Sequence, residues 1–315
     1  MFKKKLALVL KGIAMGAADV VPGVSGGTIA FITGIYEELL HTIAHLNFTT
    51  FKKLFSEGFG SFWKAINGQF LLPLITGIGL SIISLAHVVT WAIKTHPLIV
   101  WAFFFGLIVA SILLVGRQIN KWNLFVVLAL FIGAFFAYYI TLLEPGNNET
   151  GLLYLFISGL VAICAMILPG ISGAFILLLL GSYGEVLSAI KEFNLVKILV
   201  FASGCLIGLL SFSRLLSWAF KKQKNIIIAI LTGFLVGSLN KVWPWKQVIT
   251  TRINSHGEAV PLIEKNILPD MYAQLNGSPH LVGVIFAAII GVILVLGIDA
   301  LGRLWKTKNQ EISEL

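Results

Sequence analysis

Long apolar runs joined by short polar connectors dominate the chain. Six runs come close to the roughly 20 residues that a helix needs to cross a bilayer, at 70–93, 98–116, 124–143, 198–220, 226–239 and 281–301. Two further apolar regions, about 6–43 and 152–190, are each broken in the middle by a Pro-Gly pair. This pattern predicts an all-α polytopic membrane protein with six spans and two broken helical regions.

The composition agrees with this prediction. Hydrophobic residues make up 57% of the 315 and charged residues 12%, and the mean hydropathy is +0.93. The net charge of +9 does not indicate a nucleic-acid partner, because the lysines and arginines lie in loops between spans, where they report topology. Glu37, His41 and His45 are spaced along one helix face in a way that could hold a metal, but a solvated face is favoured, so no metal or cofactor is expected. No nucleotide-binding P-loop is present.

The chain contains an internal repeat. Residues 22–43 and 169–190 align without a gap and share ten identities, among them the Pro, Gly, Ser and Gly of "PGVSG" and "PGISG". A second match pairs 77–111 with 204–238, again with ten identities. We therefore expect two repeats, 1–150 and 151–315. The first carries an extra segment at 47–66 that reads as an amphipathic interfacial helix, and the second has a long outer loop at 241–280.

Loop charge orients the two repeats. If the broken regions are re-entrant hairpins and the N-terminus is inside, fourteen lysines and arginines lie in cytoplasmic segments and three in the short outer loops. If the broken regions cross instead, the basic clusters at 52–64 and 117–121 face outward, against the positive-inside rule. The sequence thus favours inverted repeats, each a re-entrant hairpin plus three spans, with both termini cytoplasmic.

The Pro-Gly breaks mark a candidate binding site. Irregular backbone at membrane depth is tolerated where it is buried in protein or lines a polar cavity, and broken helices in inverted repeats point to a transporter site. Ser25 is a good N-cap, Gly26 and Gly27 let a ligand approach the backbone, and Thr28 adds a hydroxyl. The free N–H groups of a helix start suit an anion, phosphate above all.

In the second copy Ser172 and Gly173 repeat the pattern, while Ala174 and Phe175 replace the third glycine and the threonine. The two halves are therefore not equivalent, and the first is the more polar. The alternative interpretation is that Pro and Gly only allow two hairpins to pack closely.

Ionisable groups in the apolar regions are further candidates. Arg214 aligns with His87, each four residues before a tryptophan, so inversion would place one basic group near each membrane face. The alternatives are a snorkelling arginine and an interfacial histidine without a ligand. Asp19, beside the first motif, is a candidate for proton coupling, or else for a structural hydrogen bond.

The stretch "KGIAMGAADVVPGVSGGTIAFITGIYEELL" with its echo "LPGISGAFILLLLGSYGEVL" resembles a bacterial family of polyprenyl-phosphate transporters, once catalogued as a domain of unknown function. The resemblance extends over essentially the whole chain. It implies that the protein moves undecaprenyl phosphate, the carrier lipid of wall synthesis, across the cytoplasmic membrane for reuse. The implied partners are this lipid and the membrane; protons as coupling ions are the expectation from Asp19 alone, and the oligomeric state is left open.

Two alternatives remain. Undecaprenyl-pyrophosphate phosphatases resemble this chain in their hairpins and carry a related PG-x-S-R-S signature, but Gly26 and Gly27 stand where its arginine and second serine would be. Because phosphoryl transfer depends on cationic stabilisation of the developing charge, we expect binding without bond cleavage and no enzyme activity. An exporter of a small soluble anion is compatible with the same motif.

Overall fold

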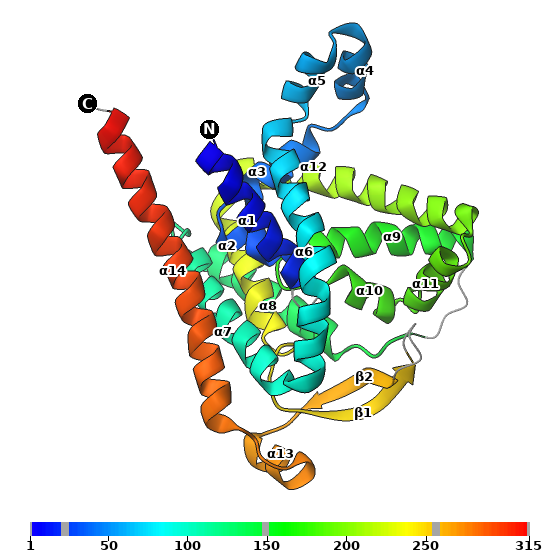
Figure 1. Cartoon of the computed structure of the whole chain (residues 1–315), viewed down its shortest axis with the longest axis vertical. Coiled ribbons are helices and arrows are strands. Elements are labelled where there is room, and N and C mark those ends of the chain that lie inside the picture. Colours follow the sequence, from blue (N-terminus) through cyan, green and yellow to red (C-terminus); the bar gives the residue numbers. More distant parts are fainter. Residues whose placement is uncertain (1, 20–24, 147–150, 254–258, 314–315) are drawn as a thin grey trace.

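The computed structural model describes residues 2–19, 25–146, 151–253 and 259–313, with the side chains of 2–3, 86–87, 252–253, 259–260 and 301–313 left out. Helices form nearly all of it (Figure 1). In chain order they are α1 (Phe2–Asp19), α2 (Gly26–Ile32), α3 (Tyr36–Ala44), α4 (Phe48–Ser56), α5 (Phe59–Ala65), α6 (Gly68–Thr95), α7 (Pro97–Gly116), α8 (Leu124–Leu142), α9 (Leu152–Ile167), α10 (Gly173–Leu179), α11 (Tyr183–Lys191), α12 (Leu195–Ser238), α13 (Pro269–Asn276) and α14 (Leu281–Ser313).

Within the described residues, five helices are long and apolar enough to cross a bilayer: α6, α7, α8, α12 and α14. All six expected spans lie in these helices, because α12 holds two of them. Its helical geometry is interrupted at Gln223 (φ −140°, ψ 54°), inside the polar run "KKQKN". Such a run is costly to place in a bilayer, so it separates two apolar arms, 195–222 and 224–238.

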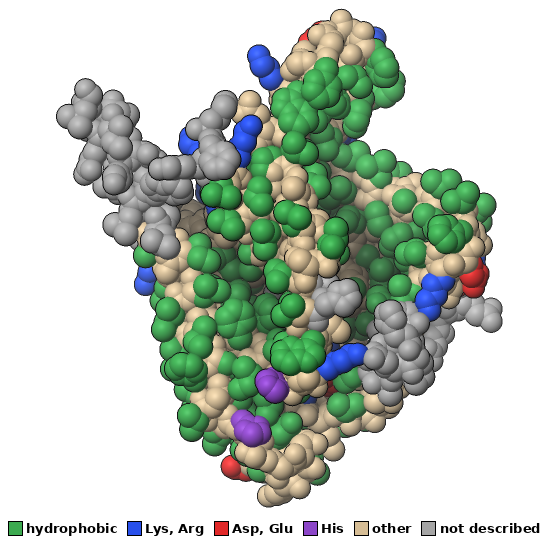
Figure 2. Space-filling view, in the orientation of Figure 1, with side chains coloured by type: hydrophobic (Ala, Val, Ile, Leu, Met, Phe, Trp, Pro, Cys, Tyr) green, Lys and Arg blue, Asp and Glu red, His purple; other side chains and the backbone are tan. Residues whose placement is uncertain are grey.

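Hydrophobic side chains cover much of the face shown in Figure 2, and its lysines and arginines are few. This distribution is typical of a protein surrounded by lipid, since apolar side chains exposed on this scale would be unfavourable in water. The structure therefore supports the prediction of a multi-pass membrane protein.

The two broken regions share an unusual local geometry. α10 and α11 meet at an angle of 108°, and α2 is followed by α3 after an equivalent break. Gly34 and Gly181, which align in the repeat, both have φ of +71°. After each, a backbone N–H reaches back to the half-helix, from Ile35 to Ala30 and from Ser182 to Leu177. These are left-handed helix caps, which glycine adopts at little cost.

Aligned glycines also make matched helix contacts. Gly77 on α6 lies against the backbone of α1, and its counterpart Gly204 on α12 lies against the backbone of α9. Gly106 on α7 lies against α14, and its counterpart Gly233 on α12 lies against α8. Small residues allow such close approach between membrane helices. The last span of each expected repeat thus packs against the other repeat.

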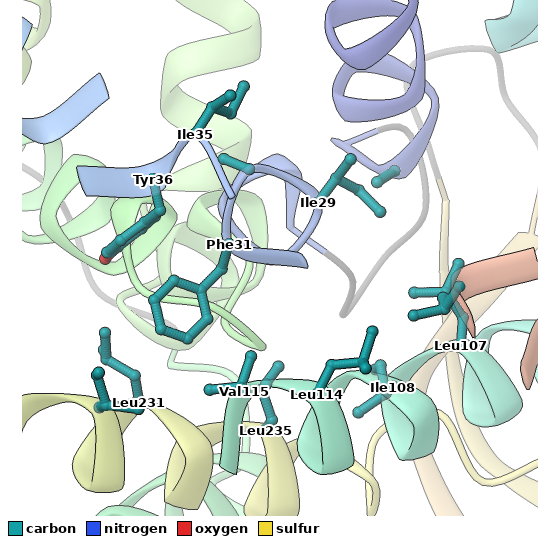
Figure 3. Close-up of a cluster of buried hydrophobic side chains, with 14 of the residues drawn as sticks. Ile29, Phe31, Ile35, Tyr36, Leu107, Ile108, Leu114, Val115, Leu231 and Leu235 are labelled. Atoms are coloured by element: carbon teal, nitrogen blue, oxygen red, sulfur yellow. The ribbon is translucent and has the colours of Figure 1, made fainter. Parts of the chain in front are cut away.

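The half-helix α2 and the start of α3 are anchored in the core. Figure 3 shows Phe31 and Tyr36 above Val115 of α7 and Leu235 of α12. Tyr36 is 2% exposed and Val115 0%. Burying each large apolar side chain favours this arrangement by about 1.5–3 kcal/mol, so the first broken region has a fixed position in the protein.

The segment at 47–66 differs from the expected single helix. It forms two short helices, α4 and α5, because Gly58 between them has φ of +84°, a conformation that ends a helix. The pair projects from the body of the protein (Figure 1) and exposes Phe48, Phe55 and Phe59. Attachment of this pair to a membrane surface stays a prediction.

The long loop at 241–280 adds a short β-hairpin to the expected helical fold. Besides α13 it contains the strands β1 (Lys246–Ile253) and β2 (Ala259–Asn266), which pair antiparallel. β-branched residues are frequent in "KQVITTRI", and such residues favour strands. We refer to the part of the molecule that carries β1, β2 and α13 as the β-hairpin end.

Candidate functional site

The described part of the first motif, residues 25–28, lies against the second motif, although the two are far apart in sequence. We call residues 22–28 the first tip and 169–173 the second tip; residues 20–24, including Pro22 and Gly23, are outside the described part. Ser25 Oγ donates a hydrogen bond to the carbonyl of Met166, at 2.9 Å. The N–H of Gly170 donates to Thr28 Oγ1, also at 2.9 Å. Two predicted hydroxyl residues therefore join the first tip to the second copy.

Gly27 sits directly against the end of α9. A Cβ built on it would lie 2.7 Å from the carbonyl oxygen of Ile167, closer than side-chain carbons approach. Tyr36, which aligns with Tyr183 in the repeat, donates from its hydroxyl to the same carbonyl, at 3.1 Å. The contact between the copies is thus tight and polar, with both tip hydroxyls 1% exposed or less.

The N-terminus of α2 has its hydrogen-bond donors satisfied within the chain. Ser25 caps the helix by accepting from the N–H of Gly27, at 3.0 Å, as the sequence predicts. The N–H of Gly26 donates to Asp19 Oδ1, at 2.6 Å, and that of Thr28 to the carbonyl of Ser25, at 2.9 Å. In this conformation a carboxylate therefore lies where an anion is expected to bind.

The second tip is less closed. Ser172 is the N-cap of α10 and 7% exposed, but its side chain makes no capping hydrogen bond. Gly173 packs against α9 of its own hairpin, where a Cβ would lie 3.0 Å from the carbonyl of Ala162. The inequivalence expected from Ala174 and Phe175 is visible as one capped helix start and one uncapped one.

Arg214 lies away from the tips. Its Nε and Nη2 donate to the carbonyls of Ala44 and Leu46, at 3.2 and 2.9 Å. Arg214 thus provides hydrogen-bond donors for the backbone carbonyls at and just after the C-terminal end of α3. These contacts hold it at the surface of the molecule, where it is exposed. The side chain of His87 lies outside the described residues; its backbone is part of α6.

A cavity of about 310 Å³ lies between α3 and α12, near Arg214. It is lined by Glu37, Glu38, Leu40, His41, Ser217, Phe220 and Lys221. Partial burial lowers the pKa of His41, and so do the neighbouring His45 and Lys221, so His41 carries less charge near neutral pH. Glu37 is paired with Lys224, at 2.7 Å, and Glu38 and Lys221 are the other charged groups of the lining, so the cavity offers an anion no excess positive charge.

A family model described as undecaprenyl phosphate translocase-like matches residues 15–260. This chain belongs to that family. A polyprenyl-phosphate transporter of Vibrio cholerae is 48% identical over 93% of this chain and 96% of its own length. A polyprenyl-phosphate transporter of Staphylococcus aureus is 34% identical over 75% of this chain and 85% of its own. No solved structure matches.

The match to the undecaprenyl phosphate translocase-like family includes the first tip, the second tip and both arms of α12. The residues that meet around the tips therefore lie within the matched range. Sequence reasoning identified the serines and glycines through the repeat. It missed the carbonyls of Met166 and Ile167, because backbone groups leave no mark in a sequence.

Proposed function

We propose that the protein moves undecaprenyl phosphate between the two leaflets of the bacterial cytoplasmic membrane, for reuse of the carrier lipid. The observation that carries this proposal is the meeting of the two tips, through Ser25 on Met166 and Thr28 on Gly170. A site built from one element of each repeat suits a transporter, because a movement of one repeat against the other opens it to alternate sides. The names of the relatives support the same substrate class.

In the proposed mechanism the phosphate headgroup passes between the tips while the polyprenyl tail stays in lipid. The tips must part, which breaks the hydrogen bonds of Ser25 and Thr28 to the second copy. The freed hydroxyls and the N–H groups of Gly26 and Gly27 then face the headgroup, together with Ser172 and Gly173. Charge-assisted hydrogen bonds to phosphate compensate for its desolvation.

Asp19 has a defined part in this mechanism. Its carboxylate accepts a hydrogen bond from the N–H of Gly26. An ionised Asp19 and a bound phosphate therefore compete for this one donor, and their negative charges repel each other. Protonation of Asp19 weakens its hold on Gly26 and removes the repulsion. This arrangement couples headgroup binding to a proton.

The matched caps at Gly34 and Gly181 and the matched glycine contacts support two copies of one helical unit. We propose that the copies are inverted in the membrane, that the broken regions are re-entrant and that both termini are cytoplasmic. This topology is supported by the excess of lysines and arginines that it places in cytoplasmic segments. The absence of arginine from positions 25–28 and 169–173 supports transport without cleavage of a phosphate bond.

The test uses purified protein in liposomes that contain undecaprenyl phosphate, with headgroup exposure followed on both sides. A parallel sample receives undecaprenyl pyrophosphate and is assayed for released phosphate. Protein-dependent headgroup movement without phosphate release is expected. Phosphate release would indicate the phosphatase instead, and no headgroup movement in the first sample would contradict the proposal and direct attention to soluble anions.

A further inference from the structure

A buried basic cluster lies at the β-hairpin end, in the loop for which the sequence suggested no role. Lys241 follows α12, Lys246 begins β1, and Glu264 lies on β2. Glu264 Oε2 is 3.3 Å from Nζ of Lys246 and 3.7 Å from Nζ of Lys241. Among the described residues, two ammonium groups thus share one carboxylate, and one positive charge is left without compensation.

Aromatic rings connect this cluster with the second tip. The ammonium of Lys246 lies 3.9 Å from the ring centre of Trp101, and that of Lys241 lies 4.8 Å from the ring centre of Phe175. Phe175 is in α10, two residues after Gly173. The electron-rich ring faces attract both cations, so they hold the two lysines beside the half-helix that follows the tip motif.

The two lysines differ in exposure and bonding. The side chain of Lys246 is 6% exposed, and its ammonium also donates to the carbonyl of Lys241, at 2.8 Å. Lys241 is 20% exposed, and its ammonium donates no hydrogen bond to the described residues. Lys246 therefore has a structural role, whereas Lys241 keeps three donors for a ligand.

The electrostatics of the cluster point in the same direction. Burial lowers the pKa of Lys246 to about 8, and Lys241 adds to this effect while Glu264 opposes it. The geometry itself gives the charge deficit: among the described residues two ammonium groups face the single carboxylate of Glu264, so the cluster lacks one negative charge. An arriving anion would supply the missing charge.

We propose that Lys241, supported by Lys246, forms a capture site for a phosphate monoester at the β-hairpin end and passes it to the second tip. The proposal rests on the proposed function for its substrate and deepens it. Lysine binds phosphate through charge-assisted hydrogen bonds, and the contact with Phe175 places the captured group next to Ser172 and Gly173.

The experiment measures binding of radiolabelled undecaprenyl phosphate to the purified full chain in detergent micelles. Lys241→Gln removes one charge from the cluster, and Lys265→Gln is the matched control, since Lys265 lies exposed on β2 next to Glu264. We expect Lys241→Gln to weaken binding about tenfold, the loss of one charge-assisted hydrogen bond, and Lys265→Gln to leave it unchanged. Lys246→Gln should weaken binding as well, provided that its melting temperature shows a folded protein.

Competitors identify the ligand. Undecaprenol has the tail without phosphate, and inorganic phosphate has the charge without the tail. Stronger competition by unlabelled undecaprenyl phosphate than by either one supports capture of the lipid headgroup, whereas equal competition by inorganic phosphate assigns the site to free phosphate and overturns the lipid assignment. Equal affinity of Lys241→Gln and wild type would overturn the proposal, even if wild-type transport in liposomes supports the proposed function.

Discussion

At the scale of single residues, Asp19 gives the most direct prediction on coupling. Its carboxylate accepts from Gly26 at the start of α2, and only the ionised form competes with phosphate there. Asn retains a side-chain oxygen for this hydrogen bond but does not titrate. We therefore expect Asp19→Asn to flatten the pH dependence of undecaprenyl phosphate transport in liposomes. A variant with the wild-type pH profile would remove Asp19 from the mechanism.

Lys246 gives a second prediction at this scale, on stability. Its pKa is lowered to about 8 in the folded protein from 10.5, so between these values the unfolded chain binds more protons than the folded one. The free energy of unfolding must then rise with pH across this window. We expect the melting temperature of wild type in detergent to gain more from pH 8 to pH 10 than that of Lys246→Met, and equal slopes would contradict the burial of this charge.

At the scale of elements, the contact between α2 and α9 depends on a glycine. A methyl group on Gly27 would meet the carbonyl of Ile167, and overpacking of this kind typically costs about 1–3 kcal/mol. We expect Gly27→Ala to separate the tips and lower transport about tenfold or more. Gly184→Ala in α11 is the matched control, because a methyl group there meets nothing within 4 Å. Equal transport by both variants would show that the tip contact is not needed.

The elements also show what the sequence can predict. The lengths of the apolar runs were enough to locate the candidate spans. The internal repeat located both tips, because a Pro-Gly break and a glycine cap each need particular residue types. The division of 47–66 at Gly58 and the strands at 241–280 escaped prediction, since a glycine in a polar segment and a short β-branched run are weak signals. The cluster of Lys241, Lys246 and Glu264 had no sequence signal, because it forms only when the β-hairpin folds back on α7 and α10.

For the whole molecule, the central claim is that the headgroup passes between the two tips, which must part in each cycle. The decisive measurement cross-links Ser25→Cys with Met166→Cys by a short thiol reagent, with Cys164 and Cys205 replaced by alanine. The control cross-link joins Gln247→Cys with Lys265→Cys, which are paired across β1 and β2. Because Ser25 itself faces the headgroup, transport of undecaprenyl phosphate in liposomes is compared with that of the same double-cysteine variant before cross-linking. Transport should stop on cross-linking of the tips, return when the link is reversed, and continue in the control. Normal transport with the tips cross-linked would contradict the account.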